Sequence, residues 1–243
     1  MMAARSAKPN RIAALLVHGY TASGAVFAFL GIDLVYRNDV RLAFVMMLLA
    51  TIVDATDGTF ARWARVKAVT PEIDGAHLDD IVDYLTFVLL PMVLAHHEQL
   101  FPPALSLWIV AAVLLSSGYA FVAADAKTAD HFFTGFPSYW NILVLYLVVF
   151  RGPAVVNAAI TLVLVALVFV RIGYVYPSRT PVLRRLTLAL AYGWGVSLAV
   201  LIWQLPDAQA GLAIASLAFP VYYFVLSIVL NSRRGSPDAA LQC

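Results

Sequence analysis

The fold of this chain is decided by residues 54–83, which read DATDGTFARWARVKAVTPEIDGAHLDDIVD. Four aspartates lie at the inner ends of the two apolar segments that this stretch connects: Asp54, Asp57, Asp79 and Asp83. A carboxylate at the middle of a bilayer costs roughly 2.5 to 3.5 kcal/mol on insertion scales, and less near the interface. Carboxylates in such positions are therefore expected to serve a function.

The composition indicates a membrane protein. Of the 243 residues, 62% are hydrophobic and only 12% are charged, whereas a soluble domain would carry about 25% charged residues. The net charge of +2 is too small to indicate nucleic-acid binding, and the basic residues lie in short blocks between apolar segments. The single cysteine, Cys243, excludes an intramolecular disulfide and a cysteine-based metal site.

Apolar segments near the length that crosses a bilayer as a helix, about 20 residues, predict eight transmembrane helices. They cover residues 12–35, 40–61, 75–95, 103–124, 137–150, 153–172, 184–204 and 209–230. We expect the first to be an uncleaved span rather than a signal peptide, because its apolar run continues to Tyr36. No internal repeat or soluble domain is visible, so residues 1–243 are predicted to form a single domain.

Positive charges decide the number of spans. With eight spans and a cytoplasmic N-terminus, only Arg37, Arg41 and Arg151 of the 16 basic residues lie outside. A seven-span alternative, in which residues 137–172 are merged, would strand Arg151 in lipid and place most of the later basic residues outside. The positive-inside rule therefore favours an all-α bundle of eight helices with both termini in the cytoplasm.

This topology puts an acidic stripe on each of two adjacent antiparallel helices, in the cytoplasmic half of the bilayer. At 100° per residue, the stripe on the second span covers an arc of about 100° and contains Asp54, Asp57, Gly58 and Ala61. The stripe on the third span covers about 80° and contains Gly75, Asp79 and Asp83. The small residues on both stripes would let a ligand or a neighbouring backbone approach closely.

The two stripes predict a metal site that handles phosphate. Converging carboxylates in a low-dielectric pocket would repel one another and take up protons unless cations were present. Hard oxygen ligands select Mg²⁺, Mn²⁺ or Ca²⁺, and a pair of divalent ions suits a diphosphate during in-line displacement. Arg62, one residue beyond the stripe, can reach phosphate oxygens with its planar guanidinium. Asp80 points away from the stripe, so we expect it to support the site from behind or to face solvent. Asp74 is expected to be solvated or to cap the third span, and not to bind metal.

A family resemblance follows from the spacing, which is Asp54-x2-Asp57-Gly58-x2-Ala61-Arg62, then 12 residues, then Gly75-x3-Asp79-x3-Asp83. This pattern resembles the signature of the CDP-alcohol phosphotransferases. These membrane enzymes transfer a phospho-alcohol group from a CDP-linked donor to an acceptor hydroxyl and release CMP. Most members have a shorter loop between the arginine and the second glycine. The longer loop, the number of spans and two inner loops, residues 125–141 and 174–187, resemble the branch of bacterial phosphatidylcholine synthases.

The resemblance implies a role for each matching residue. The ligands of two divalent cations, Mn²⁺ or Mg²⁺, would be Asp54, Asp57, Asp79 and Asp83, and Asp83 would also be the general base. The CDP site would be lined by Gly58, Ala61, Arg62 and Gly75. The donor would be CDP-diacylglycerol and the acceptor choline. The resemblance also implies a homodimer among the lipids of a bacterial inner membrane, with its active site facing the cytoplasm.

A choline acceptor needs aromatic faces or a carboxylate, because its quaternary ammonium makes no conventional hydrogen bond. The candidates on the cytoplasmic side are Tyr84, Tyr139, Trp140 and Asp125. Arg179 is a candidate contact for the donor phosphate. Each of these residues could equally be an ordinary interfacial side chain or topology charge.

Other functions remain open at this point. Serine, inositol or glycerol phosphate could replace choline as the acceptor. A cation-coupled or proton-coupled transporter also uses carboxylates at the midplane, but favours broken helices and related halves. The second span has no proline, and the later half of the chain has no second acidic cluster. An intramembrane aspartyl protease would call for a Gly-x-Gly-Asp motif, which is absent.

Overall fold

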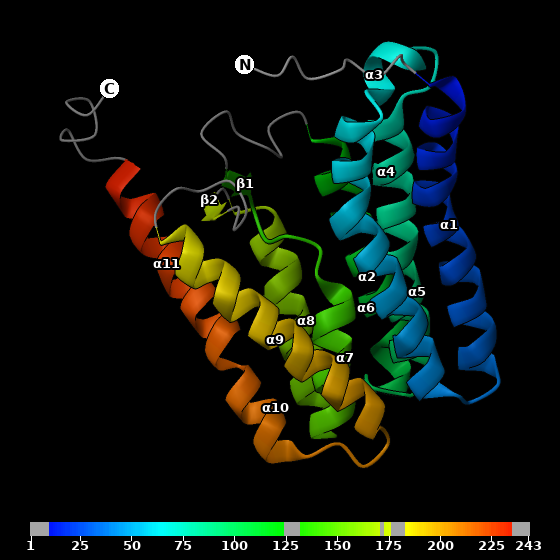
Figure 1. Ribbon diagram of the computed structural model, residues 1–243. Coiled ribbons are helices and arrows are strands. Elements are labelled where there is room, and N and C mark those ends of the chain that lie inside the picture. Colours follow the sequence, from blue (N-terminus) through cyan, green and yellow to red (C-terminus); the bar gives the residue numbers. More distant parts are fainter. Residues whose placement is uncertain (1–9, 124–131, 171–172, 176–182, 235–243) are drawn as a thin grey trace.

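The computed structural model describes residues 10–123, 132–170, 173–175 and 183–234 (Figure 1). Its helices are α1 (Arg11–Tyr36), α2 (Val40–Trp63), α3 (Val66–Val69), α4 (Gly75–Asp83), the π-helix η1 (Tyr84–Leu89), α5 (Leu90–His97), α6 (Pro103–Val122), α7 (Trp140–Phe150), α8 (Ala154–Val168), α9 (Arg184–Gln204), α10 (Ala210–Ser216) and α11 (Ala218–Arg234). Strands β1 (Phe132–Thr134) and β2 (Gly173–Val175) pair antiparallel. The predicted helical fold is confirmed, and this short sheet is an addition that the sequence did not indicate.

Two of the predicted spans are interrupted near prolines. The third predicted span runs through α4, η1 and α5, and its π-helical segment begins immediately after Asp83. Pro91 has no N–H to donate to the carbonyl of Phe87, which favours an irregular turn just before it. Pro220 likewise cannot donate to Ser216, where the eighth predicted span divides into α10 and α11. The π-helix is notable because such turns often accompany functional sites.

The fifth predicted span begins at Trp140, so the predicted start at residue 137 was wrong. Gly135 has a φ of +81°, and the carbonyl of Val168 fills the space where a Cβ would lie. The N–H of Phe136 donates to the carbonyl of Leu167 at 3.1 Å. The chain before α7 is therefore held against the end of α8, and it does not extend the helix.

Elements that were predicted to be cytoplasmic gather at one end of the bundle. The start of α1, the short helix α3, the sheet and the end of α11 all lie at that end (Figure 1). Within the described ranges, four helical segments are long and apolar enough to cross a membrane: Arg11–Tyr36, Pro103–Val122, Arg184–Gln204 and Ala210–Leu230. These segments support a membrane protein, whereas the eight crossings and their orientation stay predictions.

The core is centred on α5. Leu90, Met92, Leu94 and Ala95 are completely buried there, in a cluster that also includes buried residues of α1, α2, α6, α7 and α9. Because α5 continues from α4 through η1, this buried anchor also fixes the direction of the helix that carries Asp79.

Two glycines allow α1 to lie very close to α4 and α5. A Cβ at Gly24 would lie 2.5 Å from Cγ1 of Val82, and a Cβ at Gly31 would lie 2.6 Å from Cδ2 of Leu90. Both distances are too short for real carbon atoms, so a larger residue at either position would force the neighbouring side chain or helix to shift. The packing brings α1 alongside the acidic face of α4.

We expect Gly24→Ala to lower the thermal stability of the protein, because its methyl group would overlap Val82. Overpacking of this kind typically costs about 1–3 kcal/mol. Gly19→Ala is the matched control on the same helix, since nothing lies within 4 Å of a Cβ there. The measurement is the melting temperature of both variants in one detergent. Equal melting temperatures for the two variants would contradict the close α1–α4 contact.

Candidate active site

The structure brings three of the four motif aspartates together. One carboxylate oxygen from each of Asp54, Asp57 and Asp79 lies within 4.8 Å of the others, in the part of the chain that the structure describes. Asp57 is buried and the other two are half-buried. The predicted convergence of α2 and α4 is therefore confirmed for these residues. Asp83, one turn beyond Asp79 at the end of α4, is half-buried but is not part of this group.

A residue of α1 orients the buried carboxylate. The hydroxyl of Thr21 donates a hydrogen bond to Oδ2 of Asp57 at 2.7 Å, and both side chains are buried. The preceding residue, Tyr20, shares a hydrogen bond of 2.8 Å with Thr56 on α2. Sequence reasoning missed Thr21, because a threonine in an apolar helix gives no sign of the residue it will face. The site is thus built from three helices, α1, α2 and α4.

The donor set fits a divalent metal. Mg²⁺ holds oxygen ligands at about 2.1 Å, so opposite ligand oxygens are about 4.2 Å apart. Three carboxylate oxygens within 4.8 Å of one another would need only a small inward movement to hold a divalent ion. Carboxylates are also the ligands that Mg²⁺ and Mn²⁺ prefer.

Arg62 lies beside Gly58, one helical turn earlier on α2. A Cβ at Gly58 would be 3.4 Å from Nη1 of Arg62, and Nη2 donates to the hydroxyl of Thr59 at 2.9 Å. The side chain is exposed and folds back along its own helix toward Gly58 and Thr59. This position leaves it available to an anionic ligand that approaches from the end of α2.

The other two small residues of the motif face α1. Ala61 packs against a buried cluster formed by Ala14 and Val17 of α1 with Val66 of α3. A Cβ at Gly75 would lie 3.1 Å from Cε1 of His18. Helix packing therefore accounts for part of their small size, and the predicted contact of Ala61 and Gly75 with CDP stays a prediction.

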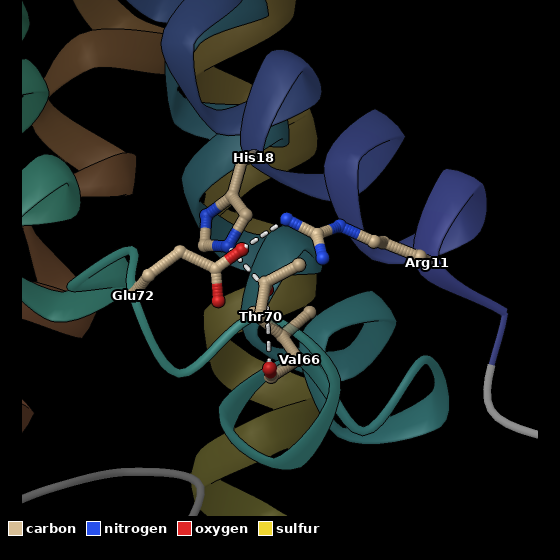
Figure 2. A network of polar contacts seen from close by, with 5 residues as sticks. All are labelled: Arg11, His18, Val66, Thr70 and Glu72. Atoms are coloured by element: carbon tan, nitrogen blue, oxygen red, sulfur yellow. Dashed lines mark hydrogen bonds and ion pairs between the residues drawn. The ribbon is translucent and has the colours of Figure 1, made fainter.

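The 12-residue loop between Arg62 and Gly75 is docked on α1. Nε2 of His18 lies 3.1 Å from Oγ1 of Thr70, and Nη2 of Arg11 lies 2.6 Å from Oε1 of Glu72, as Figure 2 shows. At the end of the loop, Asp74 accepts hydrogen bonds from the first backbone N–H groups of α4. Of the two roles expected for Asp74, solvation or capping, the structure shows that this exposed residue is a cap, which gives α4 a defined start.

The residues predicted to bind the acceptor differ in their burial and hydrogen bonding. Trp140 is completely buried, and its Nε1 donates to the hydroxyl of Ser117 at 2.7 Å. It therefore offers no open ring face, and the structure gives no support to its proposed contact with choline. The hydroxyl of Tyr84 donates to the carbonyl of Leu114 at 3.0 Å, so this group is already engaged. Tyr139 is exposed at the start of α7. Asp125 and Arg179 lie outside the described residues.

Comparison with known proteins extends the match well beyond the motif. The chain matches the CDP-alcohol phosphatidyltransferase family over residues 13–230. A phosphatidylcholine synthase of Legionella bozemanae is 46% identical over 146 residues, which span 60% of this chain and 67% of that protein. One of Legionella pneumophila is 37% identical over 222 residues, 88% of this chain and 87% of the relative. One of Pseudomonas aeruginosa is 35% identical over 197 residues, which span 81% of this chain and 83% of that protein.

The match to the family covers most of the chain, and it includes α2 and α4 with their three converged carboxylates. The chain therefore belongs to the CDP-alcohol phosphatidyltransferase family, and it is a transferase enzyme.

Proposed function

We propose that this enzyme is a phosphatidylcholine synthase, which transfers the phosphatidyl group of CDP-diacylglycerol to the hydroxyl of choline. The observation that carries the proposal is the cluster of Asp54, Asp57 and Asp79, a donor set suited to the divalent ions that neutralise a diphosphate. The choice of choline is supported by relatives named phosphatidylcholine synthase that match over most of their length.

Within this proposal the residues divide into two groups. Asp54, Asp57 and Asp79 would hold one or two divalent ions, Mn²⁺ or Mg²⁺, with Asp83 at their edge. When bound, these ions would neutralise the diphosphate of the donor and stabilise the charge on the departing CMP. Arg62 binds phosphate oxygens from the end of α2, while Thr21 keeps Asp57 in its orientation.

The transfer makes one bond and breaks another. The hydroxyl oxygen of the acceptor forms a bond to the phosphorus of the phosphatidyl group, while the bond from that phosphorus to the oxygen of CMP breaks. The proton of the hydroxyl passes to the carboxylate of Asp83, which acts as general base and later gives it to water. Asp83 suits this role because it lies one helical turn from Asp79, beside the group of three carboxylates and not within it.

The proposed setting is the cytoplasmic half of a bacterial inner membrane. Residues 1–243 form one domain of eight spans, with both termini in the cytoplasm. The gathering of α3, the sheet and the end of α11 at one end of the bundle supports this arrangement (Figure 1). The diacylglycerol chains then stay in lipid while the CDP group enters from the side that carries Arg62. The family resemblance also favours a homodimer.

The acceptor can be identified by one assay. Purified enzyme is given CDP-diacylglycerol and Mn²⁺, and labelled choline, serine, inositol and glycerol 3-phosphate are offered in separate reactions. We expect lipid product and CMP release with choline. Faster product formation with serine, inositol or glycerol 3-phosphate would overturn the choice of acceptor. It would leave the reaction class intact.

Removal of divalent metal is expected to abolish activity. EDTA should stop CMP release, and excess Mn²⁺ or Mg²⁺ should restore it, because the carboxylate cluster cannot neutralise a diphosphate by itself. Added Mn²⁺ should also raise the melting temperature, since an ion that binds only the folded state stabilises it. Full activity in EDTA, verified by metal analysis of the protein, would contradict the metal site.

A further inference from the structure

His18 is a buried titratable residue of α1 to which the mechanism above gives no part. Only 8% of it is exposed, and its Nε2 lies 3.1 Å from Oγ1 of Thr70, which is completely buried in the loop before α4. Figure 2 shows the imidazole of α1 reaching across to this loop. A histidine in an apolar helix needs such a partner, because a buried polar group without one is costly.

The direction of this hydrogen bond follows from the second contact of Thr70. Its hydroxyl donates to the carbonyl of Val66 at 3.2 Å, which uses its one hydrogen. With the hydroxyl turned that way, Oγ1 accepts from His18, and Nε2 of the imidazole carries the hydrogen. Glutamine places an amide N–H and an amide oxygen at about the same distance along the side chain, so it can retain this bond with the side chain as donor or as acceptor.

The same ring also fills the space above Gly75. A Cβ at Gly75 would lie 3.1 Å from Cε1 of His18 and 3.5 Å from Nδ1. The bond to Thr70 holds the ring in place, so the imidazole has little freedom to move away from an added methyl group. His18 is thus in contact with the end of the loop at Thr70 and with the first residue of α4 at Gly75.

This contact bears on the metal cluster because Asp79 follows Gly75 by one helical turn on the same face. We propose that His18 is a positioning residue: clamped by Thr70, it fixes the start of α4 against α1 and so places Asp79 opposite Asp54 and Asp57. Gly75 is then required to admit the imidazole, and not only to admit a nucleotide. The inference rests on the proposed function only in assuming that the cluster binds a divalent ion.

A double-mutant cycle tests this assignment. The dissociation constant of Mn²⁺ is measured by electron paramagnetic resonance, without substrate, for His18→Ala, Gly75→Ala and the double variant. We expect each single variant to weaken Mn²⁺ binding about tenfold, and Gly75→Ala to cost less than about twofold once the imidazole is gone. His18→Gln should recover most of the affinity. In turnover, KM for CDP-diacylglycerol should rise while kcat at saturating metal and donor changes little.

Glu72→Gln is the matched control in the same loop. Its partner Arg11 is on the same helix as His18, but the two side chains are 48% and 68% exposed, so the pair should contribute little. Mn²⁺ affinity should therefore stay as in the unmodified protein. Melting temperatures of all variants show whether the fold is kept, and His18→Gln provides the comparison if His18→Ala does not fold.

The proposal is overturned if Gly75→Ala costs the same with and without the imidazole, since glycine would then serve the ligand alone. It is equally overturned if His18→Ala binds Mn²⁺ as tightly as the unmodified protein, or if His18→Gln binds Mn²⁺ as weakly as His18→Ala. An error in the proposed acceptor would not affect these results, because no acceptor is present. Failure of the unmodified protein to bind Mn²⁺ would instead contradict the proposed metal site.

Discussion

Asp57→Asn is expected to lower CMP release by at least about a thousandfold. Metal ions contribute several kcal/mol of charge stabilisation in such transfers, and each 1.36 kcal/mol corresponds to about a factor of ten in rate. Asp57 is the buried member of the carboxylate cluster, and asparagine keeps its volume while removing the charge that binds the metal. The measurement is CMP release with CDP-diacylglycerol, choline and saturating Mn²⁺, together with the melting temperature. Turnover at the rate of the unmodified enzyme would rule out this role.

Thr21→Val separates the charge of Asp57 from its orientation. Valine has nearly the volume of threonine but cannot donate the 2.7 Å hydrogen bond to Oδ2 of Asp57. Hydrogen bonds to charged groups contribute about 1.5–3 kcal/mol, so we expect activity at limiting Mn²⁺ to fall about tenfold to a hundredfold. Raising the Mn²⁺ concentration should recover part of that loss, which Asp57→Asn should not allow. Activity unchanged at every Mn²⁺ concentration would show that Thr21 has no part in the site.

The acidic cluster could be predicted because helical periodicity is a local property. Once α2 and α4 are recognised as adjacent antiparallel helices, the intervals between Asp54, Asp57 and Asp79 place their side chains on facing stripes. The structure confirms that convergence. The capping role of Asp74 was predictable for the same reason, since a cap involves only residues that are close in sequence.

The part that α1 plays could not be predicted. Its sequence is apolar around most of its circumference, so no periodic signal shows which face will meet α2 and α4. Thr21 and His18 contact residues 36 and 52 positions away, and one sequence does not reveal such pairings. Trp140 shows the same limit, because composition cannot tell an exposed aromatic ring from a buried one that donates to Ser117.

Asp83→Asn is expected to lower kcat by about a hundredfold to ten-thousandfold, the usual contribution of a general base. Asparagine keeps the shape of the side chain but cannot take the proton of the acceptor hydroxyl. Because Asp83 lies outside the group of three carboxylates within 4.8 Å, Mn²⁺ affinity should fall much less than in Asp57→Asn. KM for CDP-diacylglycerol should also change little, since the donor is bound before the proton is removed.

The matched control for Asp83→Asn is Asp80→Asn. Asp80 is on the same helix and is also half-buried, but it points about 100° away from Asp79, so its loss should leave kcat nearly unchanged. Mn²⁺ affinity and kcat are measured for both variants under identical conditions. If Asp83→Asn instead loses Mn²⁺ as completely as Asp57→Asn, then Asp83 is chiefly a metal ligand, and the proton of the acceptor must leave by another group. The split between metal binding and turnover therefore decides which role this carboxylate has.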